Sequence, residues 1–195
     1  MGLPFLNNGD IKRKNSKLRR GTVLELLKPR EELFDEYYEA CKESHDNNIA
    51  EWMPFELDNF SQWKKHILNA YYNYETGTDL PEGMPRTYTY WCVDNGKFIG
   101  EVQLRPFLSE EEAKKWGHIA YAVRYSRWKQ GWGTELLRQI LLKAQEFNII
   151  DVYIVCRENN TGSIKVIEKN GGRFTNTVVD EEGNLNNVYH IATKE

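Results

Sequence analysis

The stretch YAVRYSRWKQGWGT, residues 121–134, decides how the rest of the chain is interpreted. It predicts the end of a β-strand, a short basic turn and the first turn of a helix. Gly131 and Gly133 stand where that helix should begin, and Lys129 comes just before them. The start of a helix exposes unpaired backbone N–H groups, and glycine lets a large anion approach that backbone. The stretch therefore indicates a phosphate or pyrophosphate site, although an ordinary strand-to-helix loop with two turn glycines explains it equally well.

The segments around this stretch predict a βαβ unit. HIAYAV, residues 118–123, has the composition of a strand. Apolar residues then recur on one helical face over residues 132–147. DVYIVC, residues 151–156, is almost entirely apolar, as in a strand that is buried on both faces. Strand, helix and buried strand in this order imply a crossover connection.

The remaining patterns predict one mixed α/β domain over residues 21–195, preceded by a polar, flexible arm over residues 1–20. An Asp-Asn-Gly turn at residues 94–96 predicts a hairpin. Further strands are expected over residues 22–27, 87–93, 97–104, 173–179 and 187–192, and further helices over residues 30–41, 59–74, 109–116 and 160–170. The helix at 30–41 carries a largely acidic face, which is either solvated or positioned to meet a cationic substrate.

Composition excludes several classes of protein. The 26 basic and 29 acidic residues give a net charge of −3, which is too small to favour non-specific nucleic-acid binding. No apolar run approaches 18 residues, and no signal peptide is recognised, so no membrane association is expected. The three widely spaced cysteines, Cys41, Cys92 and Cys156, indicate neither a disulfide framework nor a metal site. These features favour a cytoplasmic protein.

The common nucleotide-binding motifs do not fit. A dinucleotide fingerprint needs a third glycine at the position of Leu136, and a Walker A loop needs Gly-Lys-Ser/Thr. What remains is a basic Gly-x-Gly turn, followed one βα unit later by Asn160 at the start of a helix.

Two segments together resemble the GNAT superfamily of acyl-CoA N-acyltransferases. They are YAVRYSRWKQGWGTELL, residues 121–137, and ENNTGSIKVIEKNGG, residues 158–172. GHIAYAVR (117–124) and NTGSIKVIEKNGG (160–172) further resemble a bacterial group of acetyltransferases within that superfamily. The resemblance implies a curved, roughly seven-stranded mixed sheet, flanked by helices, that splays open between the fourth and fifth strands. Acetyl-CoA is expected in that opening as a co-substrate, with no metal ion.

The resemblance also implies which residues bind the donor. The end of the fourth strand offers backbone groups to the pantetheine, the basic turn and helix start hold the pyrophosphate, and the second segment contacts the pantetheine arm. The implied residues are Tyr121, Ala122, Val123, Lys129, Gln130, Gly131, Trp132, Gly133, Thr134, Asn160 and Ser163. Asn160 has a second interpretation, as the cap of its own helix.

The sequence departs from the family pattern at two positions. Trp128 stands where Arg or Gln is common, so one contact that such a residue could make to a phosphate or to the helix is lost, while the backbone contacts should survive. Ile167 stands where many members carry a tyrosine that protonates the leaving thiolate. The chain must therefore leave that proton to solvent or to another group, for which Tyr189 is a candidate.

Direct attack of an amine on the thioester benefits from a base, because an alkylamine with a pKa near ~10.4 is almost fully protonated at pH 7. His118 has a suitable intrinsic pKa, but a histidine packed into the sheet is the competing interpretation. Glu101, on the preceding strand, is the other candidate; it could equally face solvent or pair with Arg105.

These patterns predict an N-acetyltransferase that acts on a primary amine of a small molecule or an aminoacyl group. The missing tyrosine keeps open a non-catalytic acyl-CoA-binding or sensing domain, and a splayed sheet also allows a longer acyl donor. The acceptor is not specified by the sequence, and the family allows a homodimer.

Overall fold

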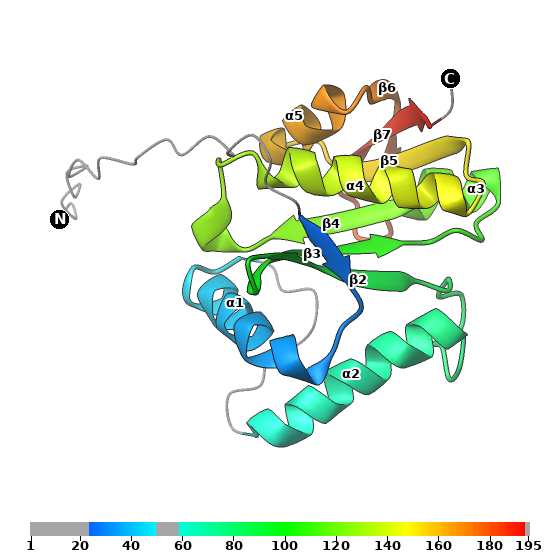
Figure 1. The fold of residues 1–195 in the computed structure, drawn as a ribbon. Helices are drawn as coiled ribbons and strands as arrows, with labels where there is room; N and C mark the ends of the chain where they lie inside the picture. Colours follow the sequence, from blue (N-terminus) through cyan, green and yellow to red (C-terminus); the bar gives the residue numbers. More distant parts are fainter. Residues whose placement is uncertain (1–23, 50–58, 194–195) are drawn as a thin grey trace, which may run out of the picture.

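We analysed a computed structural model that describes residues 24–49 and 59–193. The predicted arm at residues 1–20 and the start of the first predicted strand lie outside these residues. Within them, helices and strands follow in the predicted order (Figure 1). They are β1 (Glu25–Leu27), α1 (Phe34–Asp46), α2 (Phe60–Thr76), β2 (Tyr88–Asp94), β3 (Lys97–Leu104), α3 (Glu110–Trp116), β4 (Ile119–Val123), α4 (Trp132–Glu146), β5 (Asp151–Arg157), α5 (Thr161–Lys169), β6 (Arg173–Val179) and β7 (Leu185–Ala192).

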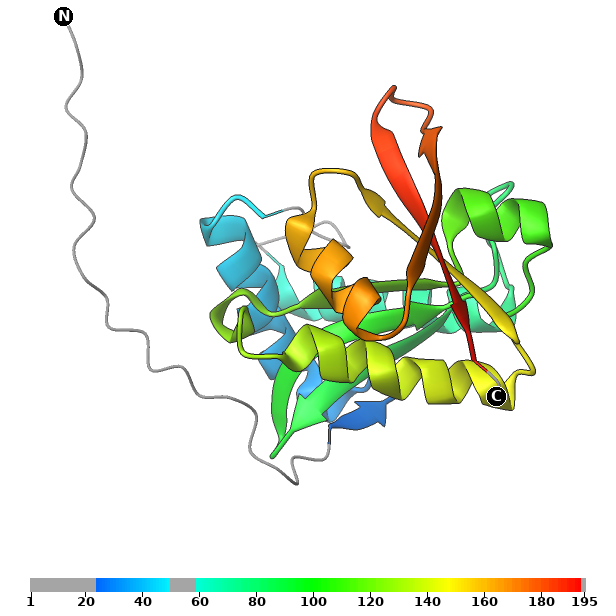
Figure 2. The ribbon, with the colours of Figure 1, turned by 90° about the horizontal axis from the view of Figure 1, so that it is seen from above.

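The seven strands form two sheets rather than one continuous sheet. One has the order β1-β2-β3-β4 and the other the order β5-β7-β6, and the paired strands in both are antiparallel. The division falls between β4 and β5, where the opening was predicted. The mixed α/β fold is thus confirmed, and Figure 2 shows the β6–β7 hairpin projecting away from the rest of the molecule.

Helices cover both faces of the four-stranded sheet (Figure 1). Successive side chains of a strand point to opposite faces. On one face, Trp91 and Phe98 pack with the rings of α1 and α2, among them Phe34 and Trp63. On the other face, Cys92 and Val102 belong to a core built around α4. The two cores fix β3 and β4 between two layers of helices. No helix of the described residues is long and apolar enough to cross a membrane.

The two sheets meet at His118, just before β4. The His118 backbone N–H donates to the Tyr153 carbonyl of β5 at 2.7 Å, and the Tyr153 N–H donates to His118 Nδ1 at 3.1 Å. The preceding residue, Gly117, has φ +73°, and a Cβ there would lie 3.1 Å from the Val155 nitrogen. Beyond this junction β4 and β5 share no strand pairing. The side chain of His118 therefore supplies the last acceptor before the sheets separate.

This arrangement predicts that His118 stabilises the fold. His118→Ala leaves the Tyr153 N–H without its acceptor, which should lower the free energy of unfolding by about 1–3 kcal/mol. In His118→Asn the amide Oδ1 takes the place of Nδ1 as the acceptor. This variant should regain most of the free energy of unfolding that the alanine variant loses. Chemical denaturation of the three proteins at pH 8 measures both effects. Equal stabilities of the alanine and asparagine variants would contradict the structural role.

The same contact predicts a pH dependence of stability. Burial lowers the pKa of His118 below its ordinary value. Because the unfolded chain then binds the proton more readily, the contribution of His118 is complete above about pH 6.5 and is lost as the pH falls. Denaturation curves of the native chain between pH 8 and 5 should show this loss. The asparagine variant should lack the part of this loss that comes from protonation of His118. An identical pH dependence of stability in both proteins would contradict this role of His118.

Candidate functional site

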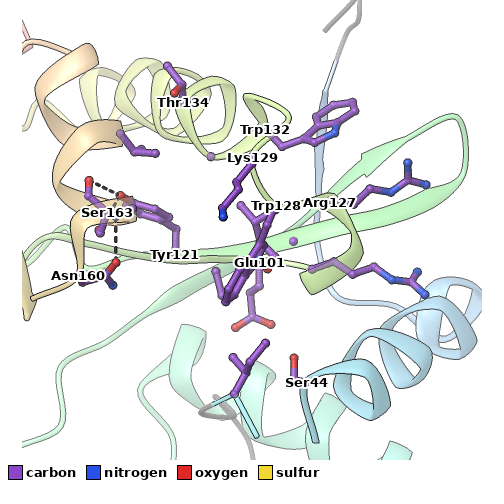
Figure 3. A pocket seen from close by; sticks show the side chains of 18 of the residues that line it. Ser44, Glu101, Tyr121, Arg127, Trp128, Lys129, Trp132, Thr134, Asn160 and Ser163 are labelled. Carbon is purple, nitrogen blue, oxygen red and sulfur yellow. Dashed lines mark hydrogen bonds between the residues drawn. The ribbon is translucent and has the colours of Figure 1, made fainter. Parts of the chain in front are cut away.

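A cavity of about 710 Å³ occupies the opening between the two sheets. It is enclosed by α1, β3, the end of β4, the turn that follows it, and the first turns of α4 and α5 (Figure 3). The predicted donor-binding residues that line it are Tyr121, Ala122, Val123, Lys129, Gly131, Trp132, Gly133, Thr134, Asn160 and Ser163. Gln130 does not line it, because its Nε2 group donates to the Ser126 carbonyl at 2.9 Å.

The first turn of α4 presents backbone N–H groups to the cavity. Gly131 precedes the helix with φ 94°, and Lys129 also has a positive φ of 60°. Gly131 makes no side-chain cap, so the amides of Trp132 and Gly133 have no partner among the described residues, whereas the Thr134 amide donates to the Gly131 carbonyl at 3.1 Å. A Cβ on Gly133 would lie 3.1 Å from Val166 Cγ2, so this glycine also allows α4 to pack closely against α5. The turn thus combines an open helix start with tight packing.

Asn160 fulfils the capping role proposed for it. Its Oδ1 accepts the Ser163 backbone N–H at 3.0 Å at the start of α5. Its Nδ2 group has no hydrogen-bond partner among the described residues and remains available to a ligand in the cavity. Ser163 also connects α5 to β4, because its hydroxyl lies 2.8 Å from the Tyr121 hydroxyl (Figure 3). This hydroxyl pair stands on the wall of the cavity.

The α4 and α5 side of the cavity carries an excess of positive charge. Lys129, Lys165 and Lys169 line it, and none of them forms an ion pair with another described residue. Together with the helix starts, they form an anion-binding surface of the kind that a pyrophosphate requires. No cluster of three or more potential metal ligands occurs within residues 24–49 and 59–193.

Glu101 lines the opposite half of the cavity and is only 4% exposed. It neither faces solvent nor pairs with Arg105, which bonds instead to the Gly117 carbonyl and to Gln103. Three donors hold the carboxyl group: Tyr71 at 2.5 Å, Trp91 at 3.2 Å and Gln103 at 3.2 Å. Burial raises the pKa of Glu101 to about 7, while the three hydrogen bonds oppose that rise. Glu101 can therefore exchange a proton near neutral pH.

The other two catalytic candidates lie away from the cavity. His118 is 6% exposed, its Nδ1 is occupied by the Tyr153 N–H, and it does not line the cavity. Tyr189 is 4% exposed, packs against Phe174 and belongs to the core around α4. Ile167, at the position of the family tyrosine, is fully buried. The structure thus brings Glu101, but not His118 or Tyr189, to the cavity that the predicted donor-binding residues line.

Two contacts that shape the site were not predicted from the sequence. Arg124 donates to Glu43 at 2.8 Å and to Glu36 at 3.1 Å, which ties α1 to the turn after β4. Trp128 donates its indole N–H to the Val123 carbonyl at 2.7 Å and lies along the cavity wall (Figure 3). The acidic face of α1 offered a signal for the first contact. The contact between Trp128 and the Val123 carbonyl had no such signal. The sequence shows only that a carbonyl at the end of a strand needs a hydrogen-bond donor.

The hydrogen bond from Tyr71 predicts a measurable effect on Glu101. Tyr71→Phe removes a donor that stabilises the carboxylate, so the pKa of Glu101 should rise further, by about one unit. The titration can be followed by carbon NMR of the labelled Glu101 carboxyl group. Tyr72→Phe, which alters an exposed neighbour on the same helix, is the control and should leave the pKa unchanged. An unchanged or lower pKa in Tyr71→Phe would contradict the assigned hydrogen bond.

Solved structures with this fold share low sequence identity with the chain. The Microcin C7 self immunity acetyltransferase MccE, in complex with acetyl-CoA and AMP, has 16% identity and a TM-score of 0.63, with 94% of this chain and 99% of that chain covered. RimL, a ribosomal L7/L12 alpha-N-protein acetyltransferase in complex with coenzyme A, has 18% identity and a TM-score of 0.62, covering 88% and 94%. The aminoglycoside acetyltransferase AAC(6')-Ib with coenzyme A has 18% identity and a TM-score of 0.60, covering 88% and 95%.

At these identities the similarity establishes the fold alone. Among curated proteins, none matches the chain. The family comparison is more informative, because the acetyltransferase (GNAT) domain matches residues 24–173. That match includes β1 to α5 and the whole wall of the cavity described above. The chain therefore belongs to the GNAT acetyltransferase family.

Proposed function

We propose that this protein transfers an acetyl group from acetyl-CoA to a primary amine by direct attack on the thioester. The observation that carries the proposal is a single cavity with two different halves. Among the described residues, one half offers helix starts and lysines without an ion pair, and the other holds one buried carboxyl group, Glu101. Family membership supports an acetyltransferase. MccE and RimL, which share the fold, are described in complex with acetyl-CoA and with coenzyme A.

The donor half suits the chemical groups of coenzyme A. The first amides of α4, with Lys129 and the Thr134 hydroxyl, would hold the pyrophosphate. The backbone of Tyr121, Ala122 and Val123 lies at the edge of β4 that faces the opening and would bond the pantetheine arm, assisted by Asn160 Nδ2. The thioester would then lie near Glu101. A helix start is an effective phosphate site because its amides and its dipole favour negative charge together.

Glu101 is the base in this proposal. An alkylammonium ion with a pKa near ~10.4 must lose a proton before it can attack. A carboxylate with a pKa of about 7 accepts that proton, and its burial shields the site from bulk water. Backbone N–H groups at the open edge of β4 would stabilise the negative charge on the tetrahedral intermediate.

The leaving thiolate needs a proton that Ile167 cannot provide. The hydroxyl pair of Tyr121 and Ser163 lies on the cavity wall, and we assign it as the proton donor to the thiolate. Burial raises the pKa of Tyr121 above its ordinary value, so this hydroxyl keeps its proton at neutral pH. Tyr189, which lies in the core, does not take this role in the proposal. We place the reaction in the cytoplasm, where acetyl-CoA is available.

The role of Glu101 predicts a specific kinetic change. Glu101→Gln should lower kcat by about 100-fold or more and leave acetyl-CoA affinity unchanged. In the native chain kcat should rise with pH through about 7, because Glu101 must be deprotonated to act, and the variant should lack this rise. Thiol release from acetyl-CoA across a set of amines measures the rate, and calorimetric titration measures the affinity.

The control is Glu110→Gln, a change on the exposed face of α3 that should affect neither quantity. Coenzyme A binding without turnover of any amine would overturn the catalytic proposal in favour of an acyl-CoA-binding domain. Turnover with a longer acyl-CoA but not with acetyl-CoA would contradict the assignment of acetyl-CoA as the donor and leave the transferase activity in place.

A further inference from the structure

We infer that the acceptor is an amine with one positive charge on an apolar body, rather than a polyamine or an aminosugar with several ammonium groups. The inference rests on the proposed function, because it identifies the half of the cavity around Glu101 as the acceptor site. It is carried by the chemistry that the described residues give to that half: apolar walls, a single carboxyl group, and arginines in the turn after β4.

The wall that faces Glu101 is built from α1, β3 and the turn after β4. It contains Tyr37, Ala40 and Cys41 of α1, Phe98 of β3, and the exposed ring of Trp128. The hydrogen bond from Trp128 to the Val123 carbonyl holds the indole along the cavity (Figure 3). These side chains offer apolar surface to the body of a substrate and few hydrogen-bond partners. On α1 the polar lining residue is Ser44 (Figure 3), and the turn after β4 adds the arginines considered below.

Glu101 is the one carboxyl group among the described residues that line the cavity. Its three protein donors already occupy part of its hydrogen-bonding capacity. It can therefore receive one ammonium group at a time. A second ammonium group on the same substrate would find no further carboxylate among the lining residues that the structure describes.

Two acidic groups of α1, Glu36 and Glu43, approach the turn after β4, and both are already paired. Glu36 pairs with Lys97 at 2.6 Å and with Arg124 at 3.1 Å, and Glu43 accepts from both the guanidinium and the Ser126 N–H. Arg124, only 14% exposed, lines the cavity in their place. Arg127 also lines it and has no ion pair within the described part of the chain. On this part of the wall a polycation would therefore meet the positive charge of Arg127, while the carboxylates of Glu36 and Glu43 are already paired with Arg124; the like charge opposes its binding.

A matched pair of probes tests the inference on the native protein. Hexylamine and 1,6-diaminohexane have the same length and differ by one ammonium group. Thiol release from acetyl-CoA should give a kcat/KM at least tenfold higher for hexylamine. An equal or higher kcat/KM for the diamine would overturn the inference while leaving acetyl transfer intact. Failure of every amine, in contrast, would remove the proposed function itself.

A gain-of-function variant tests where the acceptor lies. Ser44→Glu places a second carboxylate on the α1 wall and should shift the ratio of kcat/KM values towards the diamine by about tenfold. Ser61→Glu makes the same change on the exposed surface of α2, outside the cavity, and should leave the ratio unchanged. An unchanged ratio in Ser44→Glu would contradict an acceptor that lies along α1.

Discussion

The site depends on a single junction, where His118 joins the two sheets and then lets them separate. One backbone hydrogen bond and one side-chain acceptor connect this residue to Tyr153. Beyond that point β4 and β5 diverge, so backbone groups along both inner edges lose the partners that a continuous sheet would supply. Buried backbone groups require partners. The indole N–H of Trp128 donates to the Val123 carbonyl. The other backbone groups at these edges can form hydrogen bonds with a bound ligand.

Chain connectivity then brings the chemical groups to this opening. α4 follows β4 and α5 follows β5, so both helices start at the edge where the strands separate. Their N-terminal amides converge on one half of the cavity, where the lysines add positive charge. The other half is formed by β3 and by α1. α1 covers the face of the four-stranded sheet opposite to the face that α4 covers. Arg124 holds these halves together through Glu36 and Glu43. The acidic face of α1 is therefore neither wholly solvated nor wholly free for a substrate.

Much of the fold could be predicted because it follows from local periodicity. The strand, helix and strand predicted over residues 118–156 and the hairpin at Asn95-Gly96 appear where the pattern placed them. The crossover within one sheet was wrong, because β4 and β5 belong to different sheets, and β5 alternates between buried and partly buried residues instead of being buried on both faces. The partners of Glu101 could not be predicted, since a bulge between Cys92 and Val93 shifts the register of β2 against β3 by one residue. Without that shift Trp91 would oppose Gly100 rather than Glu101. The role of His118 was also hidden, because its contact joins residues 35 positions apart.

The proposed function requires that the opening between β4 and β5 binds coenzyme A through backbone groups. A titration of the isotope-labelled protein with coenzyme A, followed by backbone amide NMR shifts, tests this claim most directly. Saturable shifts should be largest at residues 119–123, 131–134 and 160–163, with little change in the β6–β7 hairpin. Shifts concentrated elsewhere, or no saturable shifts at millimolar coenzyme A, would contradict it.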